Sequence, residues 1–205
     1  DKHVGRRAVI EIGDPHRGTA CASIGVGRFD PPVVGVPAGE SNDQIVQLVG
    51  MAGNFGLKEL SPQLLSIAKG SGCENNLRMA ALDSLPKLVS NDALNEVLSE
   101  VATSASEPDS LRAHVAMMLG TQTDNGARAV LLKMLLTSPA SLQSSVALAL
   151  AQTEPGRATL LEAISTGKAS ARLLLEHRIA EQVSANADTE TKAKITGLTR
   201  HLPPP

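Results

Sequence analysis

The most regular feature of the chain is an apolar stripe that returns about every thirty residues. Three segments begin with a leucine and place further apolar side chains four, five and eight positions later. This spacing puts the side chains on one face of an α-helix. The leading residues stand 34 and 31 positions apart and are Leu77, Leu111 and Leu142. Self-similarity at this period is typical of helical repeat proteins.

A second set of stripes alternates with the first. In each, a leucine follows another apolar residue, and a further apolar residue comes three positions later; the leucines are Leu65, Leu98, Leu131 and Leu161. We expect these residues on the second helices of helical hairpins, which can bury their apolar faces only by stacking on neighbouring hairpins. The expected fold class is therefore all-α, an α-α superhelix (solenoid) of about four to five helix pairs.

Two weaker copies of the leading stripe precede the clear ones. Val4 begins a good match that ends at Ile12, which predicts an N-terminal helix. Ile45 begins a poor match, because Gly50 and Gly53 stand where apolar residues are expected and glycine weakens a helix interior. The first helix of the main array is therefore expected to be weak.

The chain divides into three regions on these patterns. Residues 1–41 combine the N-terminal helix with an irregular segment rich in glycine and proline, in which Asp14 starts a short helix through Ile24. Residues 42–167 form the helical repeats. Residues 168–205 form C-terminal capping helices and a proline-rich end.

Polar and glycine residues mark the expected helix ends. Ser61, followed by proline, is expected to cap its helix at the N-terminus, as are Asn91 and Asp124. Glycines lie where helices should stop, namely Gly70, Gly72, Gly120 and Gly167.

Composition excludes several classes of function. The net charge is −2 and the aromatic residues are Phe29 and Phe55, so the surface is poorly suited to nucleic acid. No apolar run approaches the length of a membrane span, so no membrane insertion is expected. The two cysteines, Cys21 and Cys73, are expected to be small buried thiols, although a disulfide between them stays open.

No catalytic or metal-binding pattern stands out. None of the five histidines has another histidine three or four positions away, so no helix offers a two-histidine metal face. The chain has no G-x-S-x-G motif for a nucleophilic serine, and the glycines around Val26 lack the rest of a dinucleotide-binding fingerprint. Glu96 and Glu100 share a helix face that is expected to be solvated. We predict no cofactor, no metal and no small-molecule ligand.

A short motif recurs at the start of the leading helices. The sequence Glu-Pro-Asp-Ser-Leu-Arg at residues 107–112 resembles the start of HEAT repeat helices, and residues 1–8 look like another copy. Arg78 and Arg112 hold equivalent positions after their leading leucines. We expect each to donate a hydrogen bond to a neighbouring turn or acid. The alternative is a ladder of positive charge for an acidic partner, which Gln143 interrupts.

The last part of the chain carries a narrower resemblance. Residues 160–174 and 195–203 look like the end of the helical-repeat region in planctomycete-type membrane-bound dehydrogenases or haem-binding proteins that contain a cytochrome c domain. The specific match covers residues 157–203, and residues 42–156 match more loosely. The chain lacks the β-propeller and the C-x-x-C-H haem site of that family. The resemblance therefore implies a spacer between redox domains and a periplasmic or secreted bacterial location.

The sequence thus predicts a non-catalytic scaffold that contacts proteins or flanking domains of a parent chain. Such arrays bind partners on a curved surface, often lined by the second helices. The candidate binding residues are Arg78, Arg112, Asn95, Arg128 and Arg157. The alternative function is an accessory lobe of a dehydrogenase or cytochrome c enzyme that contributes to its substrate or electron-transfer interface.

Overall fold

A computed structural model describes residues 11–12, 24–25, 42–185 and 187–203 of the chain. The chain divides into two compact units, Asp1–Val97 and Leu98–Pro205. The boundary between them falls inside one helix, α4 (Asn91–Thr103). Each unit is described by itself below.

In unit 1, the first described residues form a minimal sheet. Strand β1 (Glu11–Ile12) pairs antiparallel with β2 (Ile24–Gly25), so that Ile12 lies opposite Ile24. The sequence pattern predicts both isoleucines in helices, and at these positions that prediction is wrong. The remaining residues of the two expected helices lie outside the described residues.

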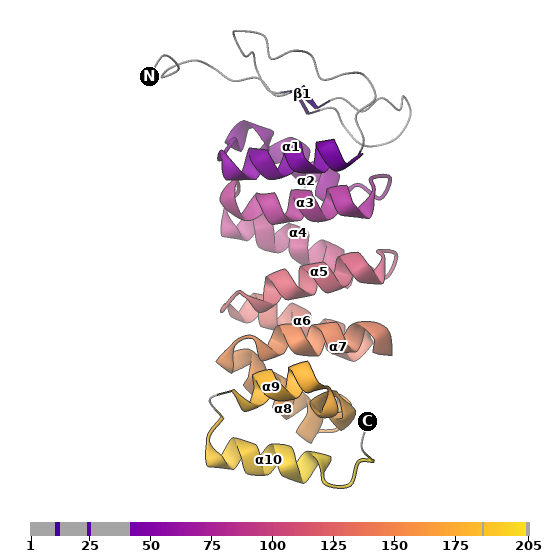
Figure 1. Cartoon of the computed structure of the whole chain (residues 1–205), viewed down its shortest axis with the longest axis vertical. Coiled ribbons are helices and arrows are strands. Elements are labelled where there is room, and N and C mark those ends of the chain that lie inside the picture. Colours follow the sequence, from indigo (N-terminus) through magenta and orange to yellow (C-terminus); the bar gives the residue numbers. More distant parts are fainter. Residues whose placement is uncertain (1–10, 13–23, 26–41, 186, 204–205) are drawn as a thin grey trace. The chain divides into compact units, whose positions relative to one another are not determined.

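The helices of unit 1 pack around α3 (Asn75–Ser84). This helix lies against both α1 (Asn42–Asn54) and α2 (Ser61–Lys69) (Figure 1). Short 3₁₀ turns precede α2 and follow α3, namely η1 (Lys58–Leu60) and η2 (Leu85–Lys87). Unit 1 ends within α4.

Unit 2 is organised around α7 (Ala140–Ala151). This helix contacts four others, α5 (Asp109–Gly120), α6 (Asn125–Thr137), α8 (Glu154–Ser165) and α9 (His177–Ser184). The last helix, α10 (Thr189–Thr199), packs against α8 and against the 3₁₀ turn η3 (Ala171–Leu175) (Figure 1). Apart from β1 and β2, the regular structure of the described residues is helical, which confirms the all-α fold class.

The predicted stripes form the core of the two units. The residues four, five and eight positions after Leu111 and Leu142 are at most 1% exposed, as are the leading leucines themselves. Leu98 and Leu131 of the second set are equally buried. Leu77 differs, because it is only half-buried although the residues that follow it in its stripe are fully buried. The periodicity therefore predicted the core positions closely.

The glycines of α1 do not prevent helix formation. A Cβ atom added to Gly53 would lie 2.8 Å from the Cβ atom of Ser84 on α3. The Ser84 hydroxyl donates to the Val49 carbonyl at 3.0 Å. Gly53 is therefore required for the close approach of α1 and α3. This glycine, which weakens the apolar pattern in the sequence, lies at the contact between the two helices.

The expected helix ends are confirmed in part. Asp124 caps α6, because its carboxylate accepts a hydrogen bond from the Ala127 amide at 2.8 Å. The predictions for Ser61 and Asn91 are wrong. η1 precedes α2 directly, so the Ser61 hydroxyl donates backwards to the Lys58 carbonyl at 2.7 Å. At the start of α4 the capping oxygen belongs to Ser90, which accepts from Ala93.

Cys73 also differs from expectation. Its side chain is 7% exposed, as predicted for a buried residue, but it is disulfide-bonded, so it is not a thiol. Cys21 lies outside the described residues.

Candidate functional site

Unit 1 has a groove on its surface. It has a volume of about 330 Å³ and lies between α2 and α4, the two second helices of this unit. Its apolar lining comes from Pro62, Leu65, Ala93 and Val97. Leu65 was predicted as a core residue, but its side chain is only half-buried because it faces this groove.

The polar residues of the groove carry opposite charges. Lys69 comes from α2 and Glu96 from α4, and both are exposed, with the Ser66 hydroxyl as the third polar group. An open groove of this kind, apolar in its lining and balanced in charge, suits a protein segment better than an anion or a metal ion. The lining includes no histidine or cysteine that would serve as a nucleophile or a metal ligand.

Asn95 lies on α4 but does not line the groove. Its side-chain oxygen is buried, and this oxygen and the Gln122 oxygen are the buried side-chain atoms without a hydrogen-bond partner among the described residues. Buried polar atoms are normally paired, so this oxygen carries an energetic cost in the packed chain. Because the atom is buried, it offers no surface to a protein partner, and a binding role for Asn95 stays a prediction.

Arg78 is used inside unit 1. Its side chain is 2% exposed, and its Nε atom donates to the Ala68 carbonyl at 3.1 Å. Ala68 is the penultimate residue of α2, where helix carbonyls lack intrahelical partners and the helix dipole is negative. The expected hydrogen bond to a neighbouring turn is confirmed, and Arg78 ties the start of α3 to the end of α2.

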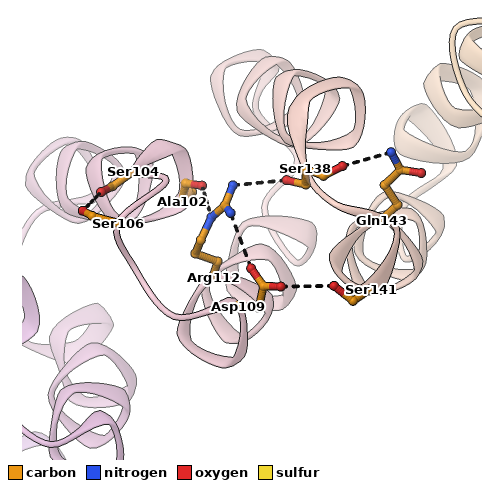
Figure 2. Close-up of polar contacts among 8 residues, drawn as sticks. All are labelled: Ala102, Ser104, Ser106, Asp109, Arg112, Ser138, Ser141 and Gln143. Atoms are coloured by element: carbon orange, nitrogen blue, oxygen red, sulfur yellow. Dashed lines mark hydrogen bonds and ion pairs between the residues drawn. The ribbon is translucent and has the colours of Figure 1, made fainter.

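Arg112 makes the corresponding contact in unit 2 and adds others (Figure 2). Its Nε atom donates to the carbonyl of Ala102, the penultimate residue of α4, at 3.2 Å. Its Nη2 atom donates to the Ser138 hydroxyl at 3.1 Å, and its Nη1 atom lies 3.6 Å from the Asp109 carboxylate. The guanidinium group therefore links the start of α5 to the end of α4 and to Ser138, the residue that follows α6.

The Arg112 network extends to α7. The Ser141 hydroxyl donates to the second oxygen of Asp109 at 3.1 Å, and the Gln143 amide donates to the Ser138 carbonyl at 3.1 Å (Figure 2). Ser141 contacts a carboxylate directly, without the imidazole that normally activates a serine nucleophile. The network joins helix ends and has no arrangement for covalent catalysis.

The other two candidate arginines lie on second helices of unit 2 and are half-buried. Arg128 on α6 donates to the side chain of Asn125 one turn earlier. Arg157 on α8 donates to the carbonyl of Ala151, the last residue of α7, at 3.2 Å. Arg157 therefore repeats the helix-end contact of Arg78 and Arg112 from a second helix. A binding role for the five candidates stays a prediction, and the geometry favours a structural role for the buried pair Arg78 and Arg112.

Sequence reasoning missed two features of these surfaces. The groove was missed because Leu65 fits the apolar stripe as well as a fully buried leucine does. The Arg112–Ser138 contact was missed because the two residues lie 26 positions apart and no local pattern links them. Most of α5 and all of α6 lie between Arg112 and Ser138 in the sequence, and packing brings the two residues together.

Titratable chemistry is sparse in the described part of the chain. Within residues 42–185 and 187–203, no group of three or more potential metal-ligating side chains is gathered at one place. The Thr191 amide donates to Asp188 at 2.7 Å and lowers the pKa of that carboxyl below its usual 3.8. Asp188 caps the exposed start of α10, so this shift reflects helix capping and does not mark an active site.

None of the helices in the described ranges is both long enough and apolar enough to traverse a bilayer. No family model matches the chain, and neither a curated protein nor a solved structure matches it. The resemblance to HEAT repeats and to dehydrogenase repeat regions therefore stays a prediction.

Proposed function

We propose that the chain is a non-catalytic helical-repeat scaffold whose hairpins stack into a HEAT-like superhelix. The observation that carries this proposal is that the same positions of the repeated apolar stripe are buried in each of three helices. The residues four and five positions after Leu111 and Leu142 are all 0% exposed, and so are those after Leu77. A sequence that repeats its core positions in phase is best explained by structural units that bury one another.

Helix-end arginines support the same proposal. Arg78 and Arg112 each bind the penultimate carbonyl of the second helix before them. The same contact at the same register in both units indicates one repeated building block.

Small-angle X-ray scattering, which measures the radius of gyration, tests the superhelix. A compact globule of this length has a radius of gyration of about 17 Å, and a stacked array should exceed it clearly. A value at or below the globular one would contradict the proposal.

The scaffold is proposed to bind a protein partner, or flanking domains of a parent chain, through its second helices. The groove between α2 and α4 lies on these helices. The family resemblance suggests that flanking domains of a redox protein are the partner, with this chain as a spacer that has no electron-transfer role of its own. No observation favours the accessory-lobe alternative over the spacer.

Two variants test the binding proposal. Leu65→Asp places a charge in the apolar part of the groove, and Lys168→Glu changes an exposed residue in the loop after α8. With the flanking domains supplied as separate purified proteins, Leu65→Asp should weaken binding at least tenfold in titration calorimetry. Lys168→Glu should bind as the unmodified chain does. Equal binding by both variants would remove the groove from the interface.

A further inference from the structure

Helix α6 begins with an asparagine that is followed by a glycine. Asn125 and Gly126 are both exposed, and they form the only Asn-Gly pair in the sequence. Asparagine is among the thermolabile residues. Glycine has no side chain to shield its backbone nitrogen, so this nitrogen can attack the side-chain amide of the asparagine before it. The attack releases ammonia and closes a succinimide ring.

We propose that Asn125 is a site of spontaneous deamidation, through which α6 acquires a carboxylate or an isoaspartate linkage at its first residue. The proposal goes beyond the scaffold function, because it concerns a covalent change in one helix and not the partner surface. Its co-reactant is water, and it needs no enzyme or cofactor.

The first turn of α6 is held less firmly than those of comparable helices. The Arg128 amide donates to the Asp124 carbonyl at 3.5 Å, whereas the equivalent bonds at the starts of α4 and α5 are 3.0 Å long. Ring closure requires the backbone of Asn125 to rotate out of the helical conformation, and a long first bond makes this opening easier.

The attacking nitrogen is also available. Gly126 is the second residue of α6, where backbone amides have no acceptor within the helix. The capping carboxylate of Asp124 accepts from the next amide, that of Ala127, at 2.8 Å. The Gly126 nitrogen therefore gives up no hydrogen bond of the helix or of its cap when it attacks.

Arg128 assists the reaction from one turn further along the helix. Its Nη2 atom donates a hydrogen bond to the Oδ1 atom of Asn125, and its side chain is half-buried. A positive charge at this oxygen draws electrons from the amide carbon and stabilises the negative charge that develops on the oxygen during the attack. We assign Arg128 the role of a positioning and activating residue.

Deamidation proceeds in two steps. A base removes the Gly126 amide proton, the nitrogen bonds to the Cγ atom of Asn125, and the Cγ–Nδ2 bond breaks, so that the side-chain nitrogen leaves as ammonia after taking up a proton. Water then opens the succinimide. Addition of water at the side-chain carbonyl gives aspartate, and addition at the main-chain carbonyl gives isoaspartate.

The two products act differently on α6. An aspartate at this position lies at the positive end of the helix and three residues before Arg128, and both features favour a negative charge. Isoaspartate adds a methylene group to the backbone between Asp124 and Ala127. The hydrogen bond that caps α6 then cannot keep its geometry, and the first turn is loosened further.

Timed incubation of the full chain tests the site. The folded protein is kept at mildly alkaline pH, digested with trypsin and analysed by mass spectrometry with fragmentation. Cleavage after lysine and arginine places Asn125 in residues 113–128 and Asn91 in residues 88–112. Asn91 is the matched control, because it is also the exposed first residue of a helix, α4, but is followed by Asp92.

We expect the acidic form to accumulate at Asn125, faster as the pH rises, and not at Asn91. A sample taken at time zero corrects for reaction during digestion. Equal rates at the two asparagines, or reaction of Asn125 only after unfolding in urea, would overturn the proposal. Neither result affects the scaffold proposal, because the groove and the buried stripes do not include Asn125.

Two variants test the individual roles. Asn125→Gln should give no acidic form in this peptide, because the longer side chain closes a ring far more slowly. Arg128→Gln should slow the reaction by about twofold to fivefold, the range expected for a solvent-accessible charged contact. A faster reaction in Arg128→Gln would show that the arginine protects the amide, which would refute the role assigned to it.

Discussion

Helices α5 and α7 share one apolar stripe but differ at the position after its leading leucine. Arg112 holds this position in α5 and Gln143 holds it in α7. Both side chains donate to Ser138, the arginine to its hydroxyl and the glutamine to its carbonyl (Figure 2). Only the arginine also reaches Ala102 near the end of α4 and the carboxylate of Asp109.

This difference distinguishes two roles of the repeated sequence, the burial of one helix face and the hydrogen bonding of helix ends. The apolar stripe sets which face of each helix is buried, and it is kept in both helices. The polar residue after the leading leucine donates hydrogen bonds to carbonyls at the ends of neighbouring helices. The identity of this residue varies with the number of acceptors around it. A guanidinium group with five N–H donors serves three partners, whereas one amide suffices where the structure offers one carbonyl.

The largest expected effect concerns the task that α5 and α7 share. Leu111 and Leu142 are 0% and 1% exposed, so Leu111→Ala and Leu142→Ala should each lower the free energy of unfolding by about 2–5 kcal/mol. Urea denaturation followed by circular dichroism measures the loss. The control is Leu136→Ala on α6, where the side chain is 44% exposed and the change should stay within about 0.5 kcal/mol. A large loss in only one of the two helices would show that their stripes are not equivalent.

The next effect concerns the position at which the two helices differ. Arg112→Gln gives α5 the residue of α7, and the shorter amide cannot reach all three partners. We expect a loss of about 2–3 kcal/mol, because buried acceptors are left unpaired. Gln143→Ala removes a single neutral hydrogen bond and should cost about 1 kcal/mol. Denaturant midpoints of the two variants give the comparison directly.

Arg128→Gln controls for the loss of a positive charge as such. Arg128 is half-buried and donates a hydrogen bond to the side chain of Asn125 on its own helix. This variant should change stability by less than about 0.5 kcal/mol. If Arg112→Gln is equally mild, the buried network does not join the helices energetically, and the comparison between α5 and α7 loses its physical meaning.

The apolar stripe that α5 and α7 share was easier to predict from the sequence than the polar contacts at helix ends, in which they differ. Apolar periodicity identified the buried faces, because burial depends mainly on a residue's place in its own helix. Helix ends were harder to predict. Ser61 failed as a cap because η1 runs directly into α2, and no local signal distinguishes that from a free helix start. The partners of Arg112 could not be predicted from the sequence. Ser138, for example, is 26 residues away and contacts Arg112 only because the helices pack together.

The candidate site was even less accessible to sequence reasoning. A groove requires two helices to diverge slightly, and Leu65 and Val97 fit their stripes whether or not a gap lies between them. The sequence places Asn95 on a second helix, but only the packed structure shows that its side-chain oxygen lacks a partner. Periodicity therefore predicts which helix faces are buried, and the spaces that remain between helices depend on side-chain fit.

A smaller effect tests how closely α5 and α7 approach. A Cβ atom on Gly120 would lie 2.5 Å from the Ala149 carbonyl oxygen of α7, so Gly120→Ala must push the two helices apart. We expect a loss of about 1–3 kcal/mol. The matched control is Gly50→Ala in α1, where an added Cβ meets nothing within 4 Å. There the lower flexibility of alanine should stabilise the helix by about 0.5–1 kcal/mol. Opposite signs in calorimetry would confirm that one glycine serves packing and the other does not.

The smallest expected effect lies at α10, which differs from α5 and α7 in burying none of its residues completely. Its start is held by Asp188, whose pKa is lowered because the Thr191 amide donates to the carboxylate. Since the folded pKa lies below the unfolded one, the contribution is complete above the usual value of 3.8 and is lost as the pH falls through the folded value. Amide exchange at Thr191 should therefore accelerate in acid while the amides of α7 stay protected. Asp188→Asn should remove most of this local pH dependence, because an asparagine caps a helix without titrating in this range. If α7 opened together with α10 on acidification, the end helix would belong to the cooperative core of unit 2, and its exposed cap would matter as much as the buried contacts of Arg112.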